Sequence, residues 1–179
     1  MRKALYFLGI LDDSDTEWII RNGKKLKVTA GTVLIEQGKP TEWLYFVMDG
    51  AFMVYTNNVP RIEELKAGEV IGEISFIDSR PPTASVRAEV TCEVGAIARQ
   101  ALSRKLEEDV GFAARFYRSI AAFLADRLRT TVGNLGVKKP QLDEGIEDVD
   151  ELAPQFLSNI SMAGMRFAEM QRRAWGANP

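Results

Sequence analysis

The sequence predicts an α+β protein in which a small all-β body lies between helical segments. Apolar residues repeat with a helical period in residues 2–22, alternate with a period of two from 26 to 99, and return to the helical period after Arg99. Glycines at turn-like intervals divide the middle region into short runs, which is typical of strands joined by tight turns. The 179 residues suffice for one well-packed domain with an extension.

The first segment predicts two helices, the second capped by Ser14 or Asp15 and ended by Gly23. Strands are then expected where apolar residues alternate, at Val33/Ile35, Tyr45/Val47 and Met53/Tyr55. Residues 56–60 contain two asparagines and a proline, so a turn is expected there.

After Arg99 we expect a short helix near Leu102–Glu108 and a long amphipathic helix over residues 110–135. The apolar stripe of the long helix consists of Ala113, Phe116, Tyr117, Ile120, Phe123, Leu124, Leu128, Thr131 and Leu135. Phe123 and Leu124 are interpreted mainly as core residues, with ligand contact as the alternative. Because so wide a stripe exceeds what a small β body covers, residues 110–135 are also predicted to form a homodimer.

The end of the chain is predicted to comprise an acidic linker at 136–150 and a helical extension at 151–179. The apolar face of the extension consists of Phe156, Ile160, Ala163, Phe167 and Met170. Such a face is expected to dock on the same chain, on a dimer mate or on a partner protein.

Composition argues against several functions. The chain has no histidine, which removes the usual general base and the commonest metal ligand, so we expect neither an enzyme nor a metal site. The single cysteine, Cys92, cannot form an internal disulfide and fits a cytoplasmic protein. The formal net charge of -2 supplies no general attraction to nucleic acid or membrane, and no apolar run is long enough to span a bilayer.

One segment could carry chemistry. Gly68 and Gly72 precede a run with helical potential that ends near Ile77. A glycine-rich entry to a helical turn presents unpaired backbone N–H groups and can bind an anion, although such loops are more often structural turns.

The surrounding pattern resembles the cyclic-nucleotide-binding domain shared by catabolite-activator transcription factors, protein kinase A regulatory subunits and nucleotide-gated channels. The resemblance spans residues 5–135 and rests on Gly31, Leu34-Ile35, Gln37-Gly38, Tyr45-Phe46-Val47, Gly50, Val54, Gly68-Glu69, Gly72-Glu73-Ile74 and Thr83-Ala84-Ser85-Val86-Arg87-Ala88. It implies an antiparallel, jelly-roll-like β-roll with N-terminal helices, a short cassette helix and a long C-terminal helix, together forming a domain over residues 1–135.

The resemblance also implies a ligand, cAMP or cGMP, and a phosphate-binding cassette over residues 72–85. By this resemblance Glu73 would accept the ribose 2′-hydroxyl, Thr83 would offer a hydroxyl to the phosphate, and Ser85 could reach the base or the phosphate edge. The other expected ligand-binding residues are Gly72, Ile74, Ser75, Arg80, Pro82 and Ala84. The alternative for Glu73 is a solvated carboxylate favoured by the helix dipole.

The cassette departs from the family pattern at Pro82, where the family has an arginine. Loss of a bidentate phosphate contact should weaken binding roughly a hundredfold to a thousandfold. Arg80 could substitute for it, or could equally be solvated, because Pro81-Pro82 restricts the loop.

The leading hypothesis is therefore a cyclic-nucleotide-responsive regulatory module that signals through its C-terminal helices. The alternative is a scaffold or protein-interaction module that keeps the fold and has lost the ligand. A DNA-binding regulator is disfavoured, because residues 136–179 hold five cations against seven carboxylates and one usable helix.

Overall fold

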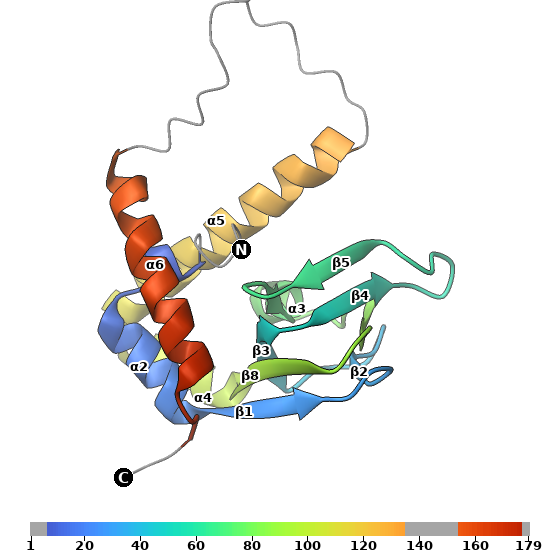
Figure 1. The fold of residues 1–179 in the computed structure, drawn as a ribbon, viewed down its shortest axis with the longest axis horizontal. Coiled ribbons are helices and arrows are strands. Elements are labelled where there is room, and N and C mark those ends of the chain that lie inside the picture. Colours follow the sequence, from blue (N-terminus) through green and yellow to red (C-terminus); the bar gives the residue numbers. More distant parts are fainter. Residues whose placement is uncertain (1–6, 135–153, 177–179) are drawn as a thin grey trace, which may run out of the picture.

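The computed structural model describes residues 7–134 and 154–176, in which two antiparallel sheets are closed on one side by helices (Figure 1). A helical turn at residues 7–10 precedes the other elements. In order, these are α2 (Asp13–Asn22), β1 (Gly23–Val28), β2 (Val33–Ile35), β3 (Trp43–Asp49), β4 (Ala51–Tyr55), β5 (Glu63–Lys66), β6 (Val70–Ile71), α3 (Glu73–Asp78), β7 (Ser85–Ala88), β8 (Cys92–Ala98), α4 (Arg99–Glu108), α5 (Val110–Asn134) and α6 (Pro154–Arg172).

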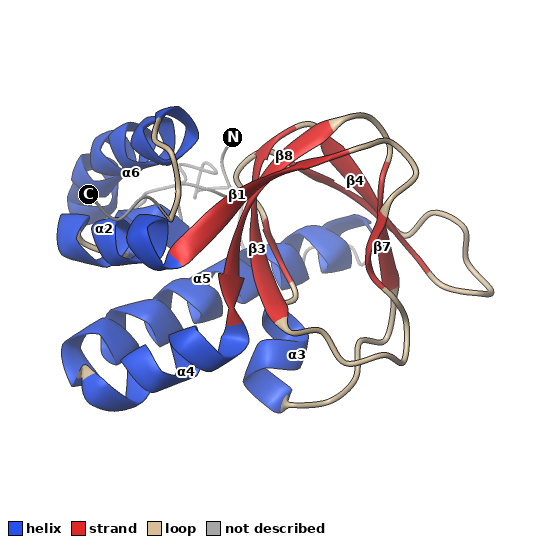
Figure 2. Cartoon of the chain, turned by 90° about the horizontal axis from the view of Figure 1, so that it is seen from below, coloured by secondary structure: helices blue, strands red, loops and turns tan. Residues whose placement is uncertain are grey.

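The two sheets form the predicted β-roll. One has the strand order β1-β8-β3-β6 and the other β2-β7-β4-β5, and every pairing is antiparallel. Figure 2 shows the strands of the roll on one side and the helices on the other. Strand β3 is buried on both faces, so its alternate residues enter two different cores. Tyr45 and Val47 face the core between the sheets, whereas Phe46 and Met48 face the helices.

The core on the helical side is rich in aromatic rings. Phe7 packs 5.4 Å from Phe46 and edge-on at 5.7 Å from Phe116, measured between ring centroids. Phe112 and Phe123 are fully buried in the same cluster. The core-packing interpretation of Phe123 is therefore confirmed, and Leu124 packs at the edge of this cluster.

The start of α2 differs from the expected caps. Asp12, not Ser14 or Asp15, is the N-cap, and its Oδ1 accepts a hydrogen bond of 2.9 Å from the backbone N–H of Asp15. The Asp15 carboxylate accepts in return from the Asp12 backbone N–H, which completes a capping box. Gly23 ends the helix as predicted.

Helix α5 buries one face and leaves part of its stripe in solvent. Phe116 and Ile120 are buried, while Tyr117 and Leu128 are 49% and 64% exposed. Part of the predicted apolar stripe is therefore not covered by the described residues of the roll.

The C-terminal helix docks on the same chain, the first of the three expected outcomes. It lies beside α2 in both views and ends at Arg172 (Figures 1 and 2). Ala163 and Met170 are buried and Phe167 packs against the helix-side core. The predicted linker at 136–150 lies outside the described residues.

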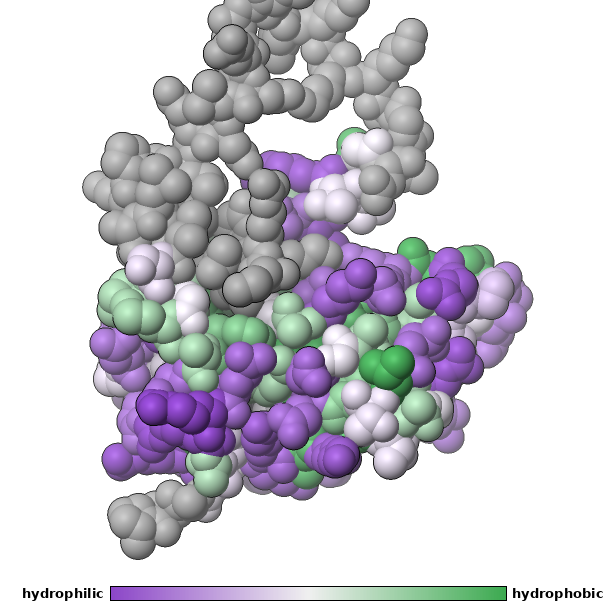
Figure 3. Space-filling model, viewed as in Figure 1, coloured by the Kyte–Doolittle hydropathy of each residue, from purple (hydrophilic) through white to green (hydrophobic). Residues whose placement is uncertain are grey.

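Hydrophilic residues cover much of the described surface seen in Figure 3, with smaller apolar patches between them.

Candidate functional site

The cassette begins at a glycine that the backbone requires. Gly72 is the N-cap of α3 with φ 95°, in the left-handed region, and a Cβ there would lie 3.2 Å from the carbonyl oxygen of Trp43. Helix α3 then runs for six residues from Glu73 to Asp78. The Gly72 turn thus places Glu73 directly at the entry of the helix.

A pocket of about 410 Å³ lies between α3, the following loop and the β2-β7-β4-β5 sheet. This volume is within the range typical of small-molecule sites. Its lining includes eight of the nine residues expected from the sequence, namely Gly72, Glu73, Ile74, Ser75, Arg80, Pro82, Thr83 and Ala84. Ser85 does not line the pocket: it is buried, and its Oγ accepts a 2.9 Å hydrogen bond from the backbone N–H of Gln37.

Glu73 is buried in an ion pair with a helix distant in sequence. Its side chain is 3% exposed, and its Oε1 accepts a hydrogen bond from Nη1 of Arg127 on α5. The interpretation of Glu73 as a solvated carboxylate is therefore wrong. Arg127 Nη2 lies 3.3 Å from Glu69 Oε2, and its Nε lies 3.6 Å from Glu63 Oε2. One guanidinium thus serves three carboxylates.

Burial and charge act in opposite directions on this pair. Burial raises the pKa of the Glu73 carboxyl, and the neighbouring Arg127 opposes that rise. Burial alone would lower the pKa of Arg127, but the charges of Glu73, Glu63 and Glu69 raise it. Arg127 therefore stays charged, and the ionised form of Glu73 depends on it.

Arg127 was not among the residues expected from the sequence. Its signal lies in the periodicity of α5, because Phe116, Ile120, Phe123 and Arg127 follow one another at helical spacing on the buried face. An arginine in register with buried phenylalanines needs an internal carboxylate partner. The partner itself could not be chosen without the fold, since it lies 54 residues away.

The loop after α3 has a buried proline where the sequence resemblance led us to expect an arginine. Pro82 is buried, and its carbonyl oxygen accepts a 2.8 Å hydrogen bond from the Gly38 N–H. Arg80 lines the pocket but is exposed, and its backbone N–H donates to Asp78 Oδ1 at 3.0 Å. The loop is therefore fixed through its backbone, and the Arg80 side chain extends toward solvent.

Arg99 anchors the cassette helix to the start of α4. Its Nη2 donates to the Ser75 carbonyl at 2.6 Å, and its Nη1 donates to the Thr41 carbonyl at 3.2 Å. The guanidinium also lies 5.5 Å from the ring centroid of Phe76. These contacts join α3 to the helices that follow the roll.

The described residues contain no group of three or more potential metal ligands. Within the same ranges, every helix is too short or too polar to cross a bilayer. Cys92 is buried in β8, where its thiol donates to the carbonyls of Ala51 and Val90, so it behaves as a strand residue.

The β-roll, the short helix α3 and the long helix α5, which contributes Arg127 to the pocket, resemble the cyclic-nucleotide-binding type of domain. The family model of the cyclic nucleotide-binding domain matches residues 25–109. This segment of the chain is thus similar to that domain family.

The relatives of the chain are regulatory proteins. It is 29% identical over 131 residues to the cAMP-activated global transcriptional regulator CRP of Escherichia coli, covering 69% of this chain and 60% of the relative. It is also 29% identical over 82 residues to the cAMP-dependent protein kinase regulatory subunit of Emericella nidulans, covering 45% of this chain and 20% of that protein. The chain thus spans only part of either relative.

A solved cyclic nucleotide-binding domain from Methylobacillus flagellatus has the same fold. Its TM-score is 0.67 at 21% sequence identity, with 81% of this chain and 88% of that chain covered. A cAMP-independent protein kinase A regulatory subunit from Trypanosoma brucei aligns with a TM-score of 0.54 at 22% identity, over 71% of this chain and 41% of that one.

Replacing Arg127 by Met should lower the free energy of unfolding by about 3–5 kcal/mol, because it leaves the buried Glu73 carboxylate without its cation. Denaturant unfolding measures this loss. Arg129→Met, at an exposed position of the same helix, should change stability by less than about 0.5 kcal/mol. The double variant Glu73→Gln/Arg127→Met should recover part of the loss, and equal losses in Arg127→Met and Arg129→Met would contradict the ion-pair account.

Proposed function

We propose that this chain is a cyclic-nucleotide-responsive regulatory module that binds cAMP or cGMP weakly and signals through α5 and the C-terminal segment. The observation that carries the proposal is the position of Glu73. Its carboxylate lies in the pocket at the start of the cassette helix and at the same time binds a residue of α5. A carboxylate is a pure acceptor with two oxygens, suited to a ribose hydroxyl.

The proposed signal is a change in the contact between Glu73 and Arg127. A ribose hydroxyl that donates to Glu73 shares or displaces the hydrogen bond from Arg127. The ligand therefore has different interactions in the two states of α5, which is what a shift in population requires. The described side chains of α5 from 128 to 133 are exposed, so few apolar contacts oppose movement of this end of the helix.

The alternative, a scaffold that has lost the ligand, is favoured by a specific feature of the pocket. Of the pocket-lining cations among the described residues, Arg127 is held by three carboxylates and Arg80 is exposed. An anionic ligand would thus enter a site with few available positive groups. In this alternative the Arg127–Glu73 pair is a permanent structural contact.

We further propose that the module is cytoplasmic, that it forms a homodimer through residues 110–135, and that it acts through protein contacts and not through DNA or membrane. The exposed part of the α5 stripe supports the dimer. Tyr117, Leu128 and Val132 are large apolar residues that stay exposed among the described residues.

Calorimetry with cAMP and cGMP tests the sensor hypothesis, and Glu73→Ala should weaken binding further by removing the ribose acceptor. Glu64→Ala is the matched control, because Glu64 is a more exposed carboxylate that pairs with Lys66 on the same strand. Affinity in Glu73→Ala equal to that of the control would exclude the proposed pose.

Pro82→Arg should raise cyclic-nucleotide affinity roughly tenfold or more by supplying the phosphate partner. Pro81→Arg places the same charge on the neighbouring exposed proline and should gain much less. If folded Pro82→Arg binds neither cAMP nor cGMP, the sensor hypothesis fails and the scaffold alternative stands.

Sedimentation of the wild-type chain should show a concentration-dependent dimer, and Leu128→Asp should shift it to monomer by placing a charge in the apolar contact. Met165→Asp, at an exposed position of α6, should leave the dimer intact. A wild-type monomer at every concentration would rule out the dimer.

A further inference from the structure

The helical side of the β1-β8-β3 sheet contains a slot shaped by two glycines. Gly23 lies at the start of β1 and Gly95 within β8, and the two strands are paired. A Cβ at Gly23 would lie 2.6 Å from the ring of Trp175, and a Cβ at Gly95 would be closer still to the same ring. Glycine in a strand interior weakens the strand and often marks the close approach of another group. Here that group is an indole from the end of the chain.

Trp175 fills the slot, and its indole N–H has a hydrogen-bond partner. The residue is 8% exposed, and its Nε1 donates to the Met170 carbonyl at 2.9 Å. Its ring centroid lies 6.3 Å from that of Phe46. The next residue, Gly176, donates its N–H to the Ile20 carbonyl at 3.1 Å. The indole is thus an anchor of the kind that dominates helix-docking surfaces.

The sheet also offers polar groups that the docked segment satisfies. The register of β3 against β8 shifts between Val47 and Asp49, and the carbonyl of Met48, at this irregularity, accepts a 2.6 Å hydrogen bond from Gln171 Nε2. Lys25 Nζ donates in return to the Gln171 carbonyl at 2.8 Å. These two hydrogen bonds fix the position of the docked C-terminal helix relative to β1 and β3.

Ion pairs fix the other side of the segment against the N-terminal helices. Arg166 Nε donates to Asp13 Oδ1 at 2.7 Å, and its Nη1 donates to the Leu8 carbonyl at 2.9 Å. Arg173 pairs with Glu17 of α2 and lowers the pKa of that carboxyl. Residues 161–176 are therefore complementary to the sheet and the N-terminal helices in shape, in backbone hydrogen bonds and in charge.

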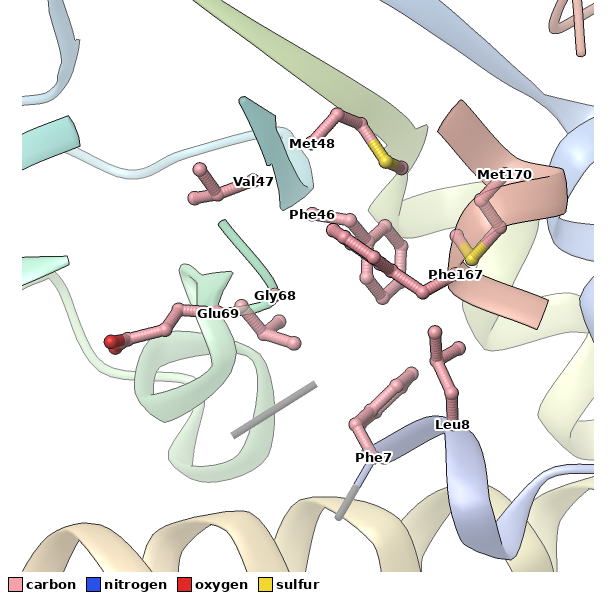
Figure 4. A pocket seen from close by; sticks show the side chains of 10 residues that line it. Phe7, Leu8, Phe46, Val47, Met48, Gly68, Glu69, Phe167 and Met170 are labelled. Atoms are coloured by element: carbon pink, nitrogen blue, oxygen red, sulfur yellow. The ribbon is translucent and has the colours of Figure 1, made fainter. Parts of the chain in front are cut away.

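The same segment packs behind the turn that holds Arg127. A cavity of about 10 Å³ is closed by Phe167 and Met170 from α6, by residues 7–8, by residues 46–48 and by the Gly68–Val70 turn (Figure 4). In this view the Glu69 carboxylate points away from Phe167 and Met170. That carboxylate contacts Arg127, whereas the Glu69 backbone carbonyl accepts from the Val47 N–H at 2.8 Å. The turn thus has the docked helix on one side and the ion pair on the other.

We propose that residues 161–176 are a cis-acting latch, which occupies a dedicated tryptophan slot on the sheet and thereby holds the Gly68–Val70 turn in the position from which Glu69 binds Arg127. The effect of the latch on ligand binding rests on the proposed function. The coupling between the slot and Arg127 does not, because both lie within the unliganded chain.

Hydrogen exchange of the full-length chain, followed by mass spectrometry, tests the latch without any nucleotide. Trp175→Ala should raise exchange in residues 161–173 roughly tenfold or more, because it removes the buried anchor. A smaller rise is expected in residues 68–73 and 123–131, which contain the turn and Arg127. Residues 85–88, in the opposite sheet, should exchange as in the wild type.

The slot is tested from the other side by Gly95→Ala, whose nearest added contacts are all with Trp175. This variant should reproduce the pattern of Trp175→Ala, and the double variant should exchange no faster than Trp175→Ala alone. Arg172→Ala is the matched control on the same segment, since its side chain is 77% exposed. Gln171→Ala removes the hydrogen bond to Met48 with little loss of core volume and replaces Trp175→Ala if the latter does not fold.

Three outcomes would overturn the proposal. Unchanged exchange in residues 161–173 would show that Trp175 is no anchor. Release of 161–173 with wild-type exchange at 68–73 and 123–131 would show that the latch is not coupled to Arg127. A uniform rise in both sheets would show that the segment is ordinary core. A pocket that fails to bind cAMP or cGMP leaves all three readouts intact, so the two proposals fail separately.

Discussion

The arrangement around the pocket depends on one electrostatic constraint, the need of a buried carboxylate for a cation. Glu73 begins the cassette helix where the chain turns through Gly72, and this geometry directs the carboxylate inward. An unpaired carboxylate there would cost several kcal/mol. Arg127 meets that need from α5, and Glu63 and Glu69 share the guanidinium from β5 and the turn before β6. The cassette, the sheet edge and the long helix are thereby connected through one side chain.

The same constraint divides α5 into two parts. From Phe112 to Phe123 the helix is held by buried aromatic and aliphatic side chains, which have no alternative to the core. Further along, Leu128 is largely exposed, and Arg127 supplies the main described polar attachment to the roll. A polar attachment can exchange one partner for another without creating a cavity. The helix therefore has a fixed first part and a second part whose position depends on charge.

Most helices and strands could be predicted from the sequence, but the side-chain contacts between them could not. Alternation in β3 and the helical spacing in α5 predicted a small all-β body and the long helix, because burial imposes these periods locally. The β-roll arrangement itself was implied by the family resemblance. The glycines at 68 and 72 predicted a glycine-rich entry to a helical turn, and the family resemblance identified this segment as the cassette. Arg127 was missed because a charge on an apolar face gives no indication of its partner. The N-cap of α2 was misplaced by two or three residues, since Asp12, Ser14 and Asp15 are all good capping residues and geometry selects among them.

The cassette loop shows a different limit. The sequence resemblance led us to expect an arginine at Pro82, but the burial of Pro82 and the hydrogen bond accepted by its carbonyl could not be predicted from the sequence. These contacts give the loop a defined backbone shape. Ser85, expected at the ligand, instead accepts a hydrogen bond from the backbone N–H of Gln37. Side-chain direction within a short strand separates these two roles, and periodicity alone does not supply it.

The paired glycines at 23 and 95 have a consequence for how such sequences can diverge. Glycine within a strand is less stable than alanine by roughly 0.5–1 kcal/mol, so selection for stability alone would replace it. Here the loss is offset by an indole that occupies the missing side-chain volume. The three positions should therefore change together across related chains: a relative that lacks the terminal tryptophan is free to carry alanine or a larger residue at both strand positions, and one that keeps it is not. Covariation of the two strand glycines with a tryptophan beyond the roll would thus be a signature, readable without any structure, of chains that fold their own C-terminus back onto the sheet.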